Sequence, residues 1–313
     1  MDLAKEIING NITALAQGIT LIESKLLEDE KNAQDLLTKC LPKSGNSIRI
    51  GITGIPGVGK STFIETFGKI FTSQGKKVAV LAIDPTSEKT QGSILGDKSR
   101  MHQLSTDKNA FIRPSPSSGT LGGVANKTRE SIILCEAAGF EIILVETVGV
   151  GQSETTVKNL VDFFLLLMIA GAGDELQGIK RGITELADAL IITKSDGDNI
   201  QKAKNAALEY KRALHLLPPN DNGWIPKVSI TSSLDNTGIL EIADTINTFD
   251  SQMLDSGWKS TNRYNQNLYW LHLKIKEELG TKKYKKLIAE GKIKLMEKKL
   301  KKGENIQNLL ENL

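Results

Sequence analysis

The sequence contains few cysteines and almost no excess charge, and both shortages exclude classes of protein. Only two of its 313 residues are cysteine, Cys40 and Cys135, which is too few for a disulfide framework. We therefore expect a protein of a reducing compartment, the cytoplasm. The formal net charge is +3, which is too small to indicate nucleic acid as a partner.

Long hydrophobic runs are missing as well. The stretch that most resembles a membrane segment, Phe163–Ala170, falls well short of the ~20 apolar residues that span a bilayer. It is bounded by Asp162 and Gly171, which favours a strand buried on both faces. The segment Met1–Gly10 has no apolar stretch typical of a signal peptide. We expect no membrane partner.

The order of the predicted elements divides the chain into three segments, 1–46, 47–250 and 251–313. The first is predicted to be helical, with one apolar face and no recognisable chemistry. Its apolar residues recur every three or four positions, at Ile12, Leu15, Ile19, Ile22 and Leu26. A second helix around Ala33–Leu41 is predicted to end at Pro42. We expect this segment to pack on the next one.

From Ser47 onward, short β-branched runs alternate with helical stretches such as Ser61–Gln74 and Thr128–Ala138. The predicted strands are Ile48–Thr53, Lys77–Ile83, Ala110–Ile112, Glu141–Val145, Phe163–Ile169, Ala189–Thr193 and Lys227–Thr231. This alternation predicts an α/β fold with a doubly wound, mostly parallel sheet. Ligands of such sheets bind beyond the carboxyl ends of the strands, where the motifs below lie.

The last segment is predicted to be helical and is rich in lysine. Apolar residues at helical spacing, Leu268, Leu271, Ile275 and Leu279, require a partner surface, either the chain's own core or a second subunit. The lysines between Lys274 and Lys302 alternate with glutamates. That alternation favours a solvated helix face over a nucleic-acid or membrane surface.

A glycine-rich loop follows the first predicted strand and matches the P-loop pattern G-x-x-x-x-G-K-S. Its backbone N–H groups would cradle phosphate oxygens at the start of a helix, whose dipole also favours the anion. Lys60 would reach the β- and γ-phosphates and the Ser61 hydroxyl would bind Mg²⁺. The predicted nucleotide-binding residues here are Gly54, Ile55, Pro56, Gly57, Val58, Gly59, Lys60, Ser61 and Thr62.

The base is selected elsewhere, in the loop Thr193-Lys194-Ser195-Asp196, which fits the [N/T]KxD guanine signature. The Asp196 carboxylate would accept hydrogen bonds from N1–H and the exocyclic amine of guanine. Adenine has a lone pair at N1 and would leave this carboxylate unpaired. The stem of Lys194 would pack along the base. Backbone contacts to guanine are expected from Ser232, Ser233 and Leu234, so GTP and GDP are the expected ligands.

Two acidic residues at predicted strand ends, Asp84 and Glu146, are candidates for holding Mg²⁺ or orienting the attacking water. Many GTPases carry aspartate where this chain has Glu146, and asparagine where it has Thr193. Three glycine-flanked loops, Gly92–Met101, Arg113–Gly123 and Gly171–Lys180, fit either surface loops or nucleotide switches. Residue types alone do not separate these two interpretations.

Taken together, these loops resemble the MeaB/ArgK family of GTPases, the chaperones of adenosylcobalamin-dependent acyl-CoA mutases. The resemblance runs from about Ile12 to at least Phe249. Its specific motifs are Gly54–Thr62, Ala82–Ser87, Gly92–Met101, Phe111–Gly123, Glu146–Glu154 and Gly171–Asp188. The sequences GSILGDK and RPSPSSGTLGG within them are not general features of P-loop proteins.

The resemblance implies a P-loop G domain flanked by an N-terminal helical segment and a C-terminal dimerisation arm, and hence a homodimer. It implies a GTPase that gates adenosylcobalamin loading and protects an acyl-CoA mutase, most often methylmalonyl-CoA mutase. By motif match, Ser61, Asp84, Asp97 and Glu146 would surround the Mg²⁺. Lys60, Asp97, Glu146 and Lys180 would act in catalysis, with Asp174 in the same loop as Lys180.

Two other functions remain open at this point. A nickel-delivering GTPase has a similar fold, but it needs soft metal ligands, and the three histidines and two cysteines here form no ligand-spaced pair. A P-loop kinase or ATPase linked to basic amino-acid transport is the other alternative. Asp196 argues against ATP, and no site for a phosphate acceptor is recognisable.

Overall fold

The computed structural model describes residues 2–83, 101–114, 121–147, 153–171, 181–216, 218 and 220–310. The chain forms two compact units, Met1–Gln252 and Met253–Leu313. No helix in the described ranges is long and apolar enough to cross a membrane.

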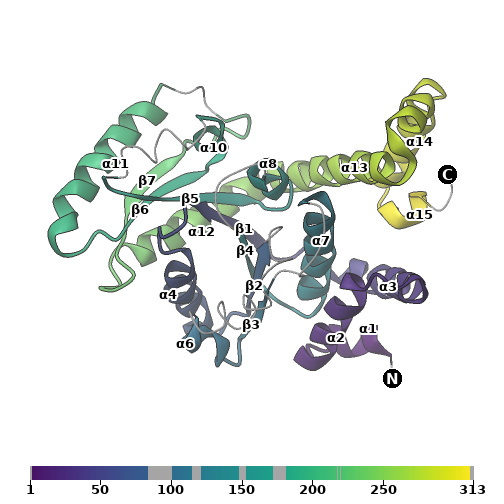
Figure 1. The fold of residues 1–313 in the computed structure, drawn as a ribbon, viewed down its shortest axis with the longest axis horizontal. Helices are drawn as coiled ribbons and strands as arrows, with labels where there is room; N and C mark the ends of the chain where they lie inside the picture. Colours follow the sequence, from purple (N-terminus) through teal and green to yellow (C-terminus); the bar gives the residue numbers. More distant parts are fainter. Residues whose placement is uncertain are drawn as a thin grey trace. The chain divides into compact units, whose positions relative to one another are not determined.

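A seven-stranded parallel sheet forms the centre of the first unit (Figure 1). Its order is β3-β2-β4-β1-β5-β6-β7, so β1 lies in the middle and β7 at one edge. The strands are β1 (Ile48–Gly54), β2 (Val78–Ile83), β3 (Ala110–Arg113), β4 (Ile142–Thr147), β5 (Phe163–Ile169), β6 (Ala189–Thr193) and β7 (Lys227–Ile230). Each overlaps a predicted strand, and the α/β prediction is confirmed. The apolar run at β5 is buried on both faces, as expected of a central parallel strand.

Helices cover both faces of the sheet, and Figure 1 shows α4 and α7 on opposite sides of the strands. Those of this unit after β1 are α4 (Lys60–Ser73), α6 (His102–Ser105), α7 (Leu121–Ala137), α8 (Ser153–Lys158), α10 (Arg181–Leu186), α11 (Ile200–Leu214) and α12 (Ile239–Asp255). Phenylalanines four residues apart on α4, Phe63, Phe67 and Phe71, form a stacked and edge-to-face series with almost no solvent exposure. This series fixes the helix that follows the phosphate loop.

The N-terminal helices α1 (Leu3–Ile8), α2 (Ile12–Glu23) and α3 (Leu27–Cys40) belong to the same unit and pack against α7. Asn11 is the N-cap residue of α2, and its side chain accepts hydrogen bonds from the N–H groups of Thr13 and Ala14. Of the predicted packing face, Leu15, Ile19 and Ile22 are buried, whereas Ile12 and Leu26 at its two ends are exposed. A 3₁₀ turn, Leu41–Lys43, follows α3 and contains Pro42.

A buried carboxylate on α7 fixes the start of β1. Glu136 accepts hydrogen bonds from the Gly45 N–H at 2.8 Å and from the Ser47 hydroxyl at 2.6 Å. It also accepts two bonds from the Arg49 guanidinium, at 2.9 and 2.8 Å. Paired geometry of this kind is among the stronger charge-assisted contacts. The strand that leads to the phosphate loop is therefore anchored at its first residues.

The short helix α6 is docked on α4. Leu104 is fully buried, and its side chain lies so close to Gly68 that a Cβ there would be 2.8 Å away. Lys69 pairs with Asp107 at 2.6 Å, and Glu65 accepts from the N–H of Gln103. These contacts fix the chain between α6 and β3.

The second unit contains α13 (Trp258–Ala289), α14 (Lys292–Lys301) and α15 (Ile306–Leu310). Gly280 interrupts α13 with φ 75° and ψ 158°, a conformation open almost only to glycine. His272 contacts Tyr284, which follows the break in α13, at 3.0 Å and Glu297 of α14 at 3.1 Å. Of the predicted apolar stripe, Leu271 and Ile275 are buried. Dimerisation through this segment stays a prediction.

Candidate functional site

Four predicted site segments meet at one edge of the sheet. The phosphate loop follows β1, Glu146 lies near the end of β4, the Lys194–Asp196 loop follows β6, and Ser232 follows β7. All strands are parallel, so their carboxyl ends lie at the same edge. Glu146 stands beside Ile52 of β1 in the register, two residues before the loop begins.

The glycines of the phosphate loop satisfy separate geometric demands. Gly54 approaches β5 so closely that a Cβ would lie 2.6 Å from the carbonyl oxygen of Leu167. Gly59 has φ 95°, in the left-handed region, and α4 begins at the next residue. The loop therefore leads directly into the N-terminus of α4, where the N–H groups of the first turn favour an anion.

Lys60 is folded over this loop. Its Nζ donates to the carbonyl oxygens of Gly54 at 2.7 Å and Ile55 at 3.3 Å. Burial lowers the pKa of Lys60, and the negative charge of Glu146 acts in the opposite direction. Glu146 is itself only 7% exposed, so a buried carboxylate faces the phosphate loop from β4. Ser61 is half-buried in the first turn of α4, and Thr62 is exposed.

The Lys194–Asp196 loop is held in a specific backbone conformation. Lys194 has φ 55°, which is uncommon outside glycine, and its Cε approaches Gly59 of the phosphate loop. The Asp196 carboxylate accepts a hydrogen bond from the Ser232 hydroxyl at 2.7 Å. The N–H of Asp235 donates to the same hydroxyl, at 3.1 Å. The side chain of Ser232 thus orients Asp196, where only backbone contacts had been predicted for this residue.

Thr193 joins the two loops directly. Its hydroxyl lies 2.7 Å from the carbonyl oxygen of Val58 in the phosphate loop and 3.0 Å from that of Met168 on β5, both buried. The hydroxyl proton of Thr193 is shared between these two carbonyl acceptors. A second buried contact, from the Thr147 hydroxyl to the Thr53 hydroxyl at 2.8 Å, joins β4 to the end of β1. Thr193 was predicted as the first residue of the guanine signature, but neither its contact with Val58 nor the contact between Thr147 and Thr53 was predicted. Such contacts join residues far apart in the sequence, and no local pattern indicates them.

Ser233 and Leu234 line a cavity of about 540 Å³ together with Thr62 and Glu65 of α4. Leu234 is 78% exposed. The loop after β7 and the helix after the phosphate loop therefore share an open surface beside the predicted base position.

The other predicted residues, Asp84, Asp97, Asp174 and Lys180, lie outside the described residues. Within the described ranges, no group of three or more His, Cys, Asp or Glu side chains is arranged to hold a metal ion. The oxygen donors at hand for Mg²⁺ are the Ser61 hydroxyl and the Glu146 carboxylate, both of the hard type that this ion prefers.

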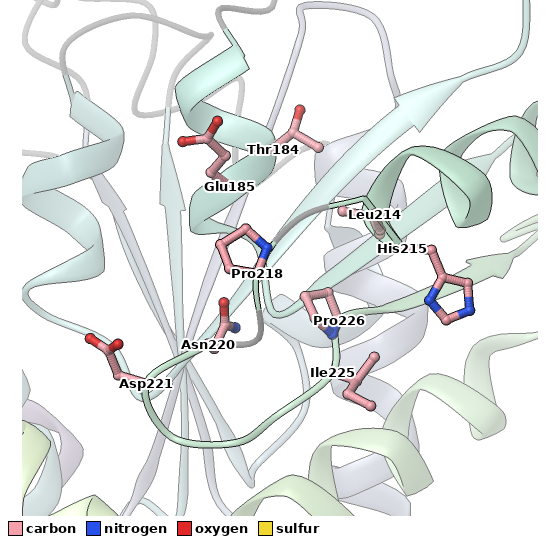
Figure 2. A pocket seen from close by; sticks show the side chains of 9 residues that line it. All are labelled: Thr184, Glu185, Leu214, His215, Pro218, Asn220, Asp221, Ile225 and Pro226. Carbon is pink, nitrogen blue, oxygen red and sulfur yellow. The ribbon is translucent and has the colours of Figure 1, made fainter.

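A separate cavity of about 610 Å³ lies near the amino ends of β6 and β7, at the opposite end of these strands from the candidate site (Figure 2). It is bounded by α10, the end of α11 and the segment that leads into β7. Figure 2 shows the carboxylates of Glu185 and Asp221 on one side and His215 on the other. Since the amino ends of β6 and β7 lie here, this cavity is not part of the candidate nucleotide site.

A parallel sheet with a glycine-rich phosphate loop after β1 defines the P-loop nucleotide triphosphatases of the G-domain type. The family model described as "Methylmalonyl Co-A mutase-associated GTPase MeaB" matches residues 15–287. The chain belongs to this family and is a GTPase.

Curated relatives and a solved structure extend the comparison. The chain is 47% identical over 270 residues to "GTPase ArgK" of Escherichia coli, covering 86% of this chain and 82% of the relative. It is 48% identical over 307 residues to "Methylmalonic aciduria type A homolog, mitochondrial" of Mus musculus, covering 95% and 74%. A structure described as "LAO/AO transport system kinase" matches at TM-score 0.77 and 39% identity, covering 89% of this chain and 83% of that one.

Proposed function

We propose that this GTPase gates the loading of adenosylcobalamin onto an acyl-CoA mutase, methylmalonyl-CoA mutase in the first instance, and protects that mutase from inactivation. The assignment of GTP binding is supported by the position of Lys60, Glu146 and Asp196, which all lie at the carboxyl ends of the parallel strands. The mutase part is supported by the description of the matching family and by the name of the mouse relative.

In this proposal, the phosphates of GTP occupy the loop Gly54–Thr62. The Nζ of Lys60 exchanges its two acceptors, the carbonyl oxygens of Gly54 and Ile55, for phosphate oxygens. Asp196, oriented by Ser232, accepts from the guanine N–H groups, and Lys194 covers the base. Ser233 and Leu234 line the open side.

Mg²⁺ fits the donor set here, with Ser61 and Glu146 supplying oxygen ligands and Asp84 and Asp97 proposed to complete the set. When bound, the ion would neutralise charge on the phosphates. Burial lowers the pKa of Lys60, and the negative charge of Glu146 opposes that effect, which favours the charged form of the lysine where GTP is expected. Lys180 is proposed to stabilise the transition-state charge.

The gating step is tested with purified methylmalonyl-CoA mutase in its apo form. Adenosylcobalamin binding to the mutase is followed by absorbance with this protein present, in GTP, in a non-hydrolysable GTP analogue and without nucleotide. The proposal predicts that the extent or rate of loading depends on the nucleotide. Loading that is the same in all three conditions would contradict gating and leave the GTPase assignment in place.

A further inference from the structure

A groove runs between α11, β7 and the start of α12, beside the edge strand β7 of the sheet. Its volume is about 720 Å³. We propose that this groove, called here the α11 groove, is where the mutase docks, through a segment that carries apolar side chains flanked by carboxylates. The inference rests on the proposed function, because it takes the mutase as the partner.

The first observation is a row of side chains along α11 that are apolar and basic in turn. Ile200, Lys204, Leu208 and Lys211 follow each other at intervals of three or four residues and all line the groove. Ile200 is 42% exposed and Leu208 is 54% exposed. Apolar side chains of this size, left open in a groove, favour a binding surface over a plain solvated helix face.

The second observation concerns charge. Neither Lys204 nor Lys211 forms an ion pair with any residue in the described part of the chain. Glu241 on α12 is the acidic residue among the groove's lining residues, which leaves an excess of one positive charge. A partner with carboxylates facing α11 would complement the two lysines, and such complementarity speeds association and selects partners.

The third observation is the open edge of β7. The N–H of Lys227 donates to the carbonyl of Asp188, and the N–H of Thr231 donates to that of Ile192, both toward β6. The backbone groups of alternate strand residues point the other way, so the N–H of Val228 points away from β6, toward the side of β7 that borders the groove. The groove therefore offers a backbone donor beside its apolar and cationic side chains.

The groove is also connected to the guanine loop. Thr237 and Gly238 line it, and Thr237 exchanges two backbone hydrogen bonds with Ser232, at 3.1 and 3.0 Å. Ser232 in turn donates to Asp196. Gly238 lies against β7 so tightly that a Cβ would be 2.2 Å from the carbonyl oxygen of Ile230. A partner bound at Thr237 and Gly238 would therefore bias the position of Asp196 and change the affinity for nucleotide. By linkage, bound nucleotide would change the affinity for the partner by the same factor.

The test measures the Kd of full-length protein for purified methylmalonyl-CoA mutase, with GDP and with a non-hydrolysable GTP analogue. The double variant Lys204→Glu/Lys211→Glu is expected to raise Kd at least about tenfold, and Leu208→Ala to raise it several-fold. The matched controls are Lys202→Glu, on another face of α11, and Leu27→Ala, on α3, where Leu27 is 86% exposed. Both controls are expected to bind as the wild type does.

Basal GTP turnover and the melting temperature show whether each variant is folded. If the charge reversal impairs folding, Lys204→Ala/Lys211→Ala takes its place, with the same expected direction. Wild-type binding that neither the double variant nor Leu208→Ala weakens would overturn the α11 groove and leave the proposed function standing. Absence of wild-type binding with either nucleotide would overturn the proposed function, and this docking site with it.

Discussion

The hydroxyl of Thr193 lies 2.7 Å from the carbonyl oxygen of Val58, and this contact joins the guanine loop to the phosphate loop. Many GTPases have asparagine at the first position of this loop. Here a shorter side chain makes the connection from the buried end of β6. The two loops that would hold opposite ends of GTP are thereby fixed relative to each other before any nucleotide binds.

Replacing Thr193 with valine keeps the shape of the side chain and removes the hydroxyl. The buried carbonyl of Val58 then loses its donor, which costs about 1–3 kcal/mol. We expect a lower melting temperature and a several-fold weaker affinity for GDP, measured by calorimetry. Thr193→Ser keeps the hydroxyl and serves as the control. A valine variant with wild-type GDP affinity would show that this contact does not position the loop.

Replacing Lys60 with alanine removes the cation that is proposed to move from the loop carbonyls to the phosphates. GTP turnover is expected to fall by roughly 10²-fold or more. The surrounding fold should persist because, among the residues that the structure describes, the Nζ of Lys60 donates hydrogen bonds only to the loop carbonyls of Gly54 and Ile55. Phosphate release measures the effect, and near-normal turnover would remove the phosphate-site assignment.

Replacing Asp196 with asparagine tests the base contact. The amide oxygen can still accept from the Ser232 hydroxyl, so the loop should keep its conformation. The new amide donor suits xanthine, which has a carbonyl where guanine has its amine. We expect the preference to move from GTP toward XTP by roughly 10²-fold or more. Competition binding with the two nucleotides provides the measurement, and unchanged GTP affinity would contradict a guanine contact.

The pair Lys69–Asp107 predicts a specific acid dependence of stability. The hydrogen bond from Lys69, followed by that from the Asn109 N–H, lowers the pKa of Asp107 to about 2 from an ordinary value of 3.8. Because the folded-state pKa lies below the unfolded one, the stabilisation is present above about pH 4 and is lost as the pH falls toward 2. Asp107→Asn should therefore be less stable than wild type near pH 6, and the difference should shrink between pH 4 and 2. Urea unfolding measured across this range would contradict the prediction if the difference stayed constant.

The sheet could be predicted because most of its strands are short apolar runs that contain β-branched residues, and β5 is apolar throughout. The phosphate loop could be predicted because its backbone geometry requires glycine. Gly54 approaches β5 closely, and Gly59 has a left-handed backbone conformation. Contacts such as Thr193 to Val58 join residues 135 positions apart, and no local pattern encodes them. The hydrogen bond from Ser232 to Asp196 likewise joins residues far apart in the sequence, and no local pattern encodes it.

The break in α13 at Gly280 shows a different limit. One glycine inside an apolar helical repeat is compatible with a continuous helix, at a cost of about 1 kcal/mol. Only the conformation of Gly280, with φ 75°, reveals the interruption. The α11 groove was likewise hidden, because it depends on β7 lying at the edge of the sheet.

The most direct measurement is phosphate release from GTP and from ATP, each with and without purified methylmalonyl-CoA mutase. We expect slow turnover of GTP alone, negligible turnover of ATP, and acceleration of GTP turnover by the mutase. GTP turnover that the mutase leaves unchanged would contradict the proposed coupling, and ATP turnover at the rate of GTP would contradict the guanine site at Asp196.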